Sequence, residues 1–255
     1  MVTDPRRATF CGRAVDWLGL DSAIDFVLRP RKVGTRPVGL LFSGGVDSSL
    51  LAWELRGVPR LALLTVGLAG SRDLDAGRAV AQQLALPWTG IEIDRLEVHE
   101  VARRIYSELN GLSAVDRSVQ TSLAVALARA PRIPLLCGQG VDELFGGYSH
   151  FRGLPPDAAA RRSEEDLEKL LSRDWPLTLR IAGKLGHSLE APYLNSQFLA
   201  AVRQVPPADR LDPTVPKAFF RAWAVHRGLP EALAARPKRA MQYGSGIDRI
   251  LRQQG

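Results

Sequence analysis

This sequence of 255 residues is poor in cysteine, in histidine and in long apolar segments. Its two cysteines, Cys11 and Cys137, provide no disulfide framework, and with only four scattered histidines they argue against a zinc site. A run of about 18 apolar residues is missing, which argues against a transmembrane helix. The first residues carry charge without an apolar segment, which argues against a signal peptide. These absences predict a cytoplasmic protein that does not bind membranes.

Lysine is scarce in a chain that is otherwise basic. The formal net charge is +7, and the 34 basic residues include only five lysines. The positive charge is compatible with nucleic acid or with anionic substrates, but its spread along the chain is typical of a solvated surface. Because arginine is used almost everywhere, a remaining lysine can mark a position where a compact ammonium group is needed. The five are Lys32, Lys169, Lys184, Lys217 and Lys238.

Short apolar segments alternate with helical ones up to about residue 150. This alternation predicts an α/β fold, a parallel sheet with helices on both faces. The later sequence is poor in strand patterns and predicts a helical C-terminal part. We expect a helical lead-in (1–34), a nucleotide-binding α/β domain (35–153) and a helical part that completes the active site (154–255). The expected strands are 38–42, 61–66, 90–94 and 133–138, and the expected helices are 48–55, 72–85, 95–109, 118–130, 163–173, 175–185, 195–204 and 216–227.

The heptapeptide SGGVDSS, residues 43–49, follows the first predicted strand and opens a helix. Ligands of parallel α/β sheets bind at the carboxyl ends of the strands. The two glycines let the backbone approach a phosphate, while the serine hydroxyls and the amides of the helix N-terminus can donate to it. A Walker A loop would end in Gly-Lys-Ser or Gly-Lys-Thr. Here Asp47 would repel phosphates unless Mg²⁺ lies between them, so we expect a metal-assisted phosphate site.

A second glycine-rich segment, LLCGQGVDELFGGYSHF, spans residues 135–151 and also follows a predicted buried strand. Asp142 and Glu143 stand just beyond its first glycines. Since the carboxyl ends of parallel strands share one edge of a sheet, Asp47 and Asp142 could hold one Mg²⁺ from opposite sides.

The heptapeptide resembles the pyrophosphate-binding loop of the N-type ATP pyrophosphatases, the PP-loop family. The segment 135–151 resembles a signature of the synthetase domain of asparagine synthetases, which is shared with β-lactam synthetases. Four further segments resemble other parts of that domain in the same order: 66–84, 187–195, 215–223 and 236–246. The resemblance covers about residues 35–250 and implies a fold of the adenine nucleotide α-hydrolase type.

This resemblance implies that ATP and Mg²⁺ are the cofactors and that AMP is transferred to a carboxylate, with aspartate as the first acceptor to consider. Ammonia or an amine would then displace AMP to form an amide. The implied metal ligands are Asp47 and Asp142. The implied catalytic residues are Lys238, Lys217, Asp142 and Glu143, and the implied nucleotide-binding residues are Leu41, Ser43, Gly44, Gly45, Val46, Asp47, Ser48, Ser49, Val66, Gly138, Gln139 and Gly140.

The sequence departs from the family on the side of the second substrate. Glutamine-dependent members begin with a cysteine after Met1 and carry a glutaminase domain. Here Val2 takes that place, so we expect free ammonia, a separate glutaminase subunit or a different amine as the nitrogen source. Gln139 replaces a family glutamate, and an amide cannot act as a base. Members of the family usually carry an acidic and a basic residue shortly before an acceptor-side glutamate. In this sequence Ile181 and Ala182 stand in their place.

An arginine that usually follows the acceptor-side glutamate is also missing, because Glu190 runs directly into Ala191 and Pro192. Glu190 and Arg117 are the acceptor-side candidates, and Arg180 and Lys184 could also compensate.

Because every departure concerns the acceptor, three alternatives stay open. The first is a PP-loop enzyme that forms amides or lactams of other small molecules or peptides. The second is an RNA-modifying enzyme, although Cys11 and Cys137 do not form the paired cysteines common in RNA thiolases. The third is an ATP-binding subunit without turnover. The expected partners are a small carboxylate and an amine, with nucleic acid and a homo-oligomer also compatible.

Overall fold

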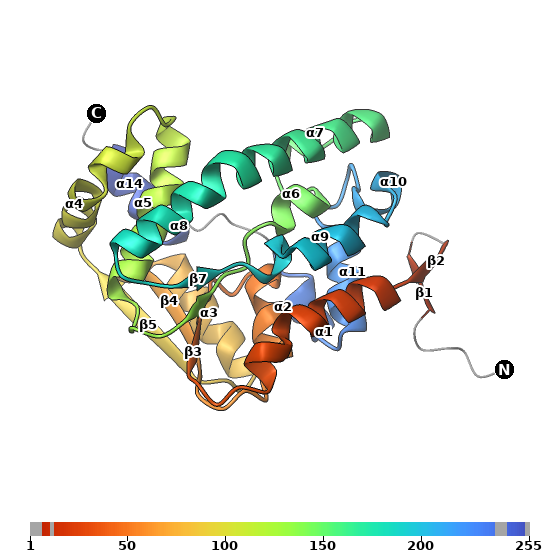
Figure 1. The fold of residues 1–255 in the computed structure, drawn as a ribbon, viewed down its shortest axis with the longest axis horizontal. Coiled ribbons are helices and arrows are strands. Elements are labelled where there is room, and N and C mark those ends of the chain that lie inside the picture. Colours follow the sequence, from red (N-terminus) through yellow and green to blue (C-terminus); the bar gives the residue numbers. More distant parts are fainter. Residues whose placement is uncertain (1–6, 11–12, 238–243, 253–255) are drawn as a thin grey trace.

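The computed structural model describes residues 7–10, 13–237 and 244–252, and its centre is a five-stranded parallel sheet (Figure 1). The strand order is β5-β4-β3-β6-β7, so the strand that precedes the heptapeptide, β3, lies in the middle. Each neighbouring pair in this sheet is parallel. The strands are β3 (Val38–Leu41), β4 (Leu61–Leu68), β5 (Trp88–Ile93), β6 (Leu135–Leu136) and β7 (Leu189–Glu190).

Both faces of the sheet are buried, which explains why its strands read as continuous apolar runs. In the register of β3 and β4, Leu40 pairs with Leu63 and Leu41 with Leu64. Successive side chains of a strand point to opposite faces. Accordingly, Leu40 and Leu63 belong to one hydrophobic core, and Leu41 and Leu64 belong to another on the other side.

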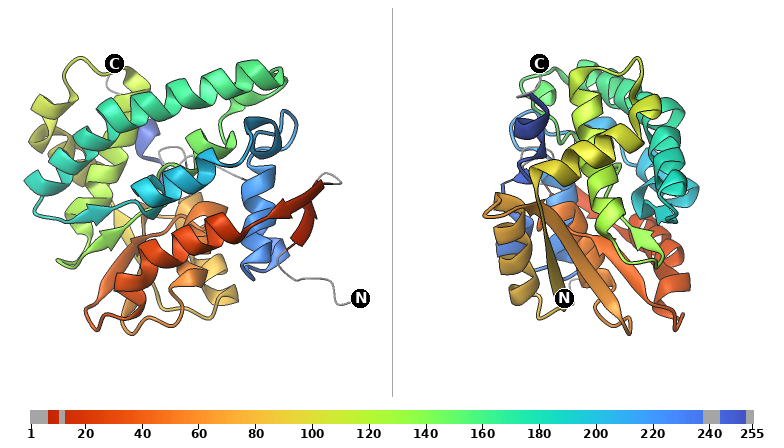
Figure 2. Two further views of the ribbon diagram at one scale, coloured as in Figure 1. Left: turned by 45° about the vertical axis from the view of Figure 1, so that its right-hand side comes forward. Right: turned by 90° about the vertical axis from the view of Figure 1, so that its left-hand side faces the viewer.

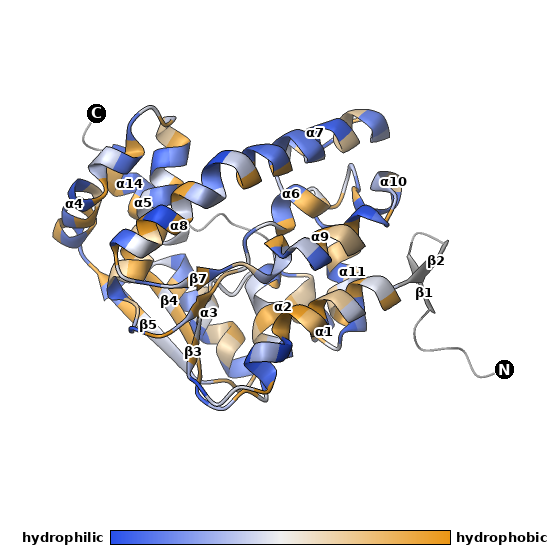
Figure 3. Cartoon of the chain, viewed as in Figure 1, coloured by the Kyte–Doolittle hydropathy of each residue, from blue (hydrophilic) through white to orange (hydrophobic). Residues whose placement is uncertain are grey.

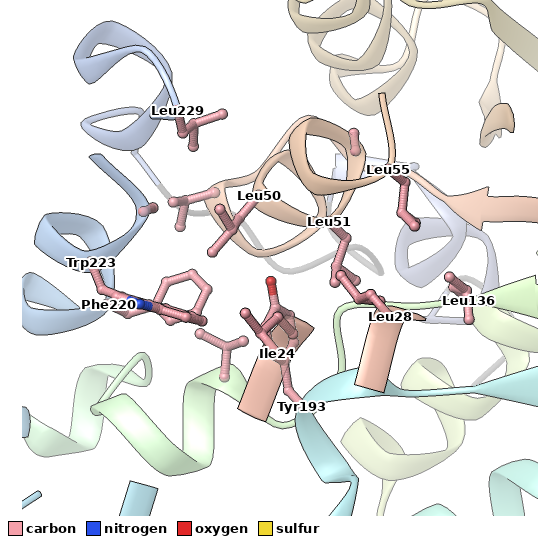
Figure 4. Packing of buried hydrophobic residues seen from close by; sticks show 14 of the residues in the cluster. Ile24, Leu28, Leu50, Leu51, Leu55, Leu136, Tyr193, Phe220, Trp223 and Leu229 are labelled. Atoms are coloured by element: carbon pink, nitrogen blue, oxygen red, sulfur yellow. The ribbon is translucent and has the colours of Figure 1, made fainter. Parts of the chain in front are cut away.

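The first core lies under α1, α2, α3, α9, α11 and α12, and Figure 4 shows its centre. Ile24 of α1 and Leu51 of α2 pack there with Tyr193, Phe220 and Trp223. The rings of Tyr193 and Phe220 are 5.5 Å apart in an edge-to-face arrangement, a favourable geometry for aromatic pairs. The helices are α1 (Leu18–Lys32), α2 (Val46–Glu54), α3 (Arg72–Gln83), α9 (Ser196–Arg203), α11 (Ala218–His226) and α12 (Glu231–Ala234).

The second core lies under α4, α5, α8 and α14, so the sheet has helices on both sides (Figure 2). Val98, Leu127, Ile181 and Ile250 are buried members from these four helices. A capping box at Asp94 begins α4, because its side chain accepts from the amide of Glu97 while the Glu97 side chain accepts from the amide of Asp94. The helices are α4 (Arg95–Arg104), α5 (Ala114–Arg129), α8 (Trp175–Lys184) and α14 (Ile247–Arg252).

A long helical segment runs along the top of the molecule and connects α7 through a π-helical turn to α8 (Figure 1). The exposed side of α7 is hydrophilic, as its blue colour in Figure 3 shows. None of the helices in the described part of the chain is long and apolar enough to cross a membrane. The other helices are η1 (Tyr106–Leu109), α6 (Val141–Phe145), η2 (Ser149–Phe151), α7 (Pro156–Lys169), η3 (Leu170–Asp174), η4 (Pro192–Leu194) and α10 (Pro207–Arg210).

The predicted α/β fold with a parallel sheet and a mainly helical C-terminal part is confirmed, with two additions. The fifth strand, β7, comes from the part that was predicted to be helical, because a strand of two residues is too short to give a periodic signal. The N-terminal lead-in contains an antiparallel hairpin of β1 (Arg7–Phe10) and β2 (Arg13–Asp16) besides α1. The division at residue 153 stays a prediction, although α2 and α11 on either side of it share one core.

Candidate active site

The heptapeptide forms a tight turn between β3 and α2, as its sequence predicts. Gly44 has φ of +69°, and a Cβ there would lie 2.8 Å from the carbonyl oxygen of Ala76, so glycine is required. The turn is stabilised internally, because the Ser48 hydroxyl donates to the carbonyl oxygen of Gly45 at 3.2 Å. The hydroxyl of Ser49 is buried and has no hydrogen-bond partner within the described residues. This hydroxyl is therefore an unpaired buried donor at the start of α2.

The second glycine-rich loop lies directly beside the first. A Cβ on Gly138 would be 3.1 Å from the Cβ of Asp47, so the two loops touch. Gly140 has φ of +105°, and a Cβ there would collide with the side chain of Leu194. Gly140 is the N-cap of α6, whose first turn carries Asp142 and Glu143. Both acid-bearing loops therefore meet at the carboxyl ends of β3 and β6.

Asp47 and Asp142 converge on the ammonium group of Lys217. Lys217 Nζ donates to Oδ1 and Oδ2 of Asp47 at 2.8 and 2.6 Å, and it lies 2.7 Å from Oδ1 of Asp142. The Lys217 side chain is fully buried. Burial alone would lower the pKa of Lys217, but the charges of Asp142 and Asp47 and their hydrogen bonds raise it above its ordinary value. The lysine is therefore charged in this site.

The backbone around Lys217 is adapted to this contact. Lys217 is the N-cap of α11 and has φ of +58° and ψ of +29°, a left-handed conformation that is rare for a side chain of this kind. Such strained residues gather at functional sites. Gly147 passes so close that a Cβ there would overlap Oδ1 of Asp142 and Cε of Lys217. Glycine at position 147 is therefore needed for the ion pair to form.

The predicted convergence of Asp47 and Asp142 is observed, and the ammonium group of Lys217 lies between them. The donor set nevertheless fits Mg²⁺, which is usually held by one or two carboxylates together with phosphate oxygens and water. Within the described residues no group of three acidic, histidine or cysteine side chains could hold a metal ion, so these two carboxylates would be the protein's share of such a site.

A cavity of about 210 Å³ opens where the two loops meet, between the ends of β3, β4 and β6 and the helix α5. Most of the residues predicted to bind the nucleotide lie on its wall. Gly44, Gly45, Val46 and Ser49 belong to the same turn but do not line the cavity, and Lys238 falls outside the described residues. The predicted residues that line it are Leu41, Ser43, Asp47, Ser48, Val66, Gly138, Gln139, Gly140, Asp142 and Glu143.

A second cavity of about 1100 Å³ adjoins the first, and both share Gln139, Glu143 and Tyr148 on their walls. The Tyr148 hydroxyl donates to Oε1 of Glu143 at 2.6 Å. Burial, followed by the charges of Glu143 and Asp142, raises the pKa of Tyr148 well above its ordinary value, so its hydroxyl stays a donor. The second cavity extends from these residues to α5, α7, η3 and the segment 215–237.

The structure does not bring the acceptor-side candidates to these two cavities. The carboxylate of Glu190 pairs with Arg31 in a separate groove beside β7. Arg117 is exposed on α5 and lines neither cavity, and Arg180 and Lys184 lie near Glu108, at 3.7 and 3.5 Å. The cations on the wall of the larger cavity are instead Arg152, Arg162, Lys169 and Arg221.

Sequence reasoning missed three residues that support the site. The buried hydroxyl of Tyr193 donates to the backbone oxygen of Asp47 at 3.0 Å. Arg221 donates to the carbonyl oxygens of Ala234 and Arg236, so it ties α11 to the chain just before Lys238. The third is Asp73, which lines the smaller cavity. Tyr193 and Arg221 carry no local sequence signal, because their partners are distant in the chain.

Asp73 is expected to make the stability of the protein depend on pH. It is only 6% exposed in the first turn of α3, and its Oδ2 has no hydrogen-bond partner within the described residues. Burial raises its pKa to about 7. Because this folded-state pKa lies above that of an unfolded aspartate, the cost of ionising Asp73 is absent at low pH and grows as the pH rises from about 4 to about 7.

We therefore expect Asp73→Asn to stabilise the protein at pH 8 by up to about 4 kcal/mol, and to bring little gain at pH 4. Denaturant unfolding of both proteins at the two pH values measures this. The matched control is Asp75→Asn, which changes an exposed carboxylate in the same turn and should give the same small difference at both pH values. An equal effect of Asp73→Asn at pH 4 and pH 8 would contradict the prediction.

Known proteins similar in sequence to this chain are asparagine synthetases. The asparagine synthase family matches residues 19–190 and 181–254. A putative glutamine-hydrolysing asparagine synthetase of Methanocaldococcus jannaschii is 28% identical over 275 residues, which cover 91% of this chain and 50% of that protein. Asparagine synthetase B of Escherichia coli is 27% identical over 258 residues, which cover 91% of this chain and 45% of that protein. The chain thus spans about half the length of the curated relatives it matches.

Among solved structures, the ammonia-dependent NAD synthetase of Campylobacter jejuni is similar, with a TM-score of 0.38 and 15% identity, over 68% of this chain and 94% of that one. The family match spans nearly all of the described sheet and both acid-bearing loops. The chain therefore belongs to the asparagine synthase family.

Proposed function

We propose that this chain is an AMP-forming carbon–nitrogen ligase. It would transfer AMP from ATP to a carboxylate with release of pyrophosphate, and ammonia or an amine would then displace AMP to form an amide. The observation that carries the proposal is the pair of acid-bearing loops whose carboxylates converge on the buried ammonium of Lys217. The family relationship supports ATP as a substrate and aspartate as the first acceptor to test.

In the first step, a carboxylate oxygen of the acceptor attacks the α-phosphorus, and the bond to the oxygen that bridges to the β-phosphorus breaks. The backbone amides of residues 43–45 and the hydroxyl of Ser48 would bind the departing pyrophosphate. Lys217, and Lys238 by its match to the family lysine, would stabilise the negative charge that develops on it. Leu41, Val66 and Gly138 line the smaller cavity, where they would contact the nucleoside.

Mg²⁺, when bound by Asp47 and Asp142, would screen the charge of the phosphate oxygens. Lys217, which now donates to Asp47 and lies beside Asp142, would share these two carboxylates with the metal. A simple consequence is that Mg²⁺ and ATP should bind to the protein together more tightly than either binds alone.

In the second step, the amine nitrogen bonds to the carbonyl carbon, AMP leaves, and the nitrogen loses a proton. Gln139 cannot accept this proton. Glu143 lies on the wall between the two cavities and is the carboxylate that we propose for this role, held in place by the hydroxyl of Tyr148. The names of the relatives describe them as glutamine-hydrolysing, so a glutaminase, within a longer protein or as a separate subunit, is a proposed source of ammonia.

The test is to incubate the chain with ATP, Mg²⁺, ammonium and a panel of carboxylates and to measure pyrophosphate and AMP. We expect equal amounts of the two products with at least one acceptor, and loss of both in Asp47→Asn. Formation of ADP and phosphate would overturn the reaction type. Absence of ATP cleavage with every carboxylate, together with measurable ATP binding, would favour the alternative of a nucleotide-binding subunit without turnover.

A further inference from the structure

The larger cavity is the place from which an acceptor can reach the nucleotide. This inference rests on the proposed function, since an adenylated carboxylate must touch the α-phosphate. The smaller cavity is closed on its sheet side by Leu41, Leu64 and Val66, and it shares Gln139, Glu143 and Tyr148 with the larger one. An acceptor bound in the larger cavity therefore meets the phosphate site at these shared residues.

The larger cavity is much bigger than an amino acid. Its volume of about 1100 Å³ exceeds the roughly 300–1000 Å³ that usually hold a drug-sized ligand. It is bounded by α5 on one side, by α7 and η3 on another, and by the segment 215–237. A free aspartate would contact only a small part of these walls, whereas a molecule several times larger could contact all of them.

The charged side chains around this cavity largely neutralise one another. Asp116 pairs with Lys169 at 3.2 Å and with Arg173 at 2.7 Å. Asp166 pairs with Arg162 at 3.1 Å and with His150 at 2.7 Å. Burial alone would raise the pKa of Asp116, but its hydrogen bonds with Ser113, Arg173 and Lys169 hold it below its ordinary value. Because these wall charges are already paired, they would bind an additional charged group of the acceptor only weakly. A small, highly polar acceptor would therefore gain little from them.

Aliphatic side chains form much of the remaining wall. Val115 on α5 and Val215 before α11 are 50% and 49% exposed, and both line the cavity. Leu170 also lines it, and Val119 and Leu123 lie on the wall that it shares with the smaller cavity. Exposed apolar residues are unremarkable when single, but several on one concave wall are typical of a ligand site.

One cation is suitably placed for the reacting carboxylate. Arg221 lines the larger cavity, where its Nε donates to the carbonyl oxygen of Pro216 at 3.0 Å and its Nη1 to that of Arg236 at 2.9 Å. Burial lowers its pKa from the ordinary value, but an arginine remains charged at neutral pH. A carboxylate near Arg221 would leave the rest of the acceptor against the aliphatic wall.

From these observations we infer that the acceptor is a peptidyl or N-acylated amino acid with an apolar body, and not free aspartate. The carboxylate would enter at the shared residues, and the apolar body would lie between Val115 and Val215. No new bond is required beyond those of the proposed reaction, because only the substituent on the acceptor changes.

The experiment compares free aspartate, N-acetyl-aspartate and the tripeptide Leu-Leu-Asp as acceptors for the full chain, with ammonium and Mg-ATP. We expect kcat/KM for pyrophosphate release to be at least about tenfold higher with the tripeptide than with free aspartate, which corresponds to about 1.4 kcal/mol. Binding of the tripeptide is measured in parallel by calorimetry, so that recognition is observed separately from turnover.

The variant Val115→Trp fills the mouth of the cavity from an exposed position on α5. It should lower the affinity and the kcat/KM for the tripeptide by about tenfold, and shift the ratio of tripeptide to aspartate turnover toward aspartate. The control is Leu96→Trp, because Leu96 is 76% exposed on α4 and does not line the cavity. This control should behave as the unchanged protein.

The outcomes separate the inference from the proposed function. If aspartate is the best acceptor and Val115→Trp leaves the ratio unchanged, the inference is wrong while the proposed reaction stands. If the tripeptide binds, and Val115→Trp weakens that binding, but no carboxylate gives pyrophosphate, the binding site stands and the proposed reaction fails. Absence of both binding and turnover would overturn both.

Discussion

Replacing Lys217 with methionine is expected to abolish pyrophosphate release and to lower the free energy of unfolding by about 3–5 kcal/mol. The side chain is fully buried, and its ammonium group lies 2.6 to 2.8 Å from carboxylate oxygens of Asp47 and Asp142. Without it, two carboxylates face one another in a site shielded from water. Methionine has a side chain of similar length but no charge. The loss of stability and of pyrophosphate release therefore measures mainly the electrostatic contribution of Lys217.

Urea unfolding and a pyrophosphate assay measure the two effects. The control is Lys184→Met, which removes an exposed lysine 3.5 Å from Glu108 and should cost at most about 1 kcal/mol. Adding Asp142→Asn to Lys217→Met should recover part of the stability, because it removes one of the two facing charges, but should not recover activity. If Lys217→Met alone is as stable as the original protein, Lys217 is not the group that holds the two carboxylates together.

Replacing Lys238 with alanine is expected to slow pyrophosphate release by about 10²- to 10³-fold, and to leave the free energy of unfolding within about 0.5 kcal/mol. Lys238 matches the family lysine that stabilises the leaving pyrophosphate. Lys238 itself lies outside the described residues, but the segment that leads to it lies at the larger cavity. Pro237 lines this cavity, and Arg221 donates to the carbonyl oxygen of Arg236 at 2.9 Å.

Single-turnover formation of AMP is the appropriate measurement, because it isolates the first chemical step from product release. Arg249→Ala removes an exposed cation of the same C-terminal part and should leave the rate unchanged. Lys238→Arg should keep more activity than Lys238→Ala, since it preserves the charge but not the shape of the ammonium group. A rate for Lys238→Ala within threefold of the original would show that Lys238 does not stabilise the leaving pyrophosphate.

The sheet and the two loops could be predicted from the sequence because their physical requirements are local. A buried parallel strand must be apolar on both faces, and the turns that follow it need glycine where φ is positive, as at Gly44 and Gly140. The same local patterns predicted that Asp47 and Asp142 follow the carboxyl ends of two strands. Strand β7 escaped prediction because two residues carry no pattern, and its place in the sheet comes from pairing with β6.

The partners of the site residues could not be predicted in the same way. Lys217 was noted for the rarity of lysine in this chain and for its match to the family, but only folding brings it between two loops that are far from it in sequence. The acceptor-side role of Glu190 stays a prediction, and its side chain pairs with Arg31 of α1 in the groove beside β7. A residue in an edge strand can face either side, and one position of register decides which.

The short strand β7 has a further consequence for how the protein behaves at high concentration. It closes one edge of the sheet, and exposed edge strands are templates onto which another chain can add. A strand of two residues offers only a brief row of backbone donors and acceptors, and Pro192, which has no amide hydrogen, follows soon after it. Arg31 and Glu190 also place charges at this edge. The edge is thereby protected against intermolecular strand addition, so this side of the sheet should resist aggregation while the chain folds.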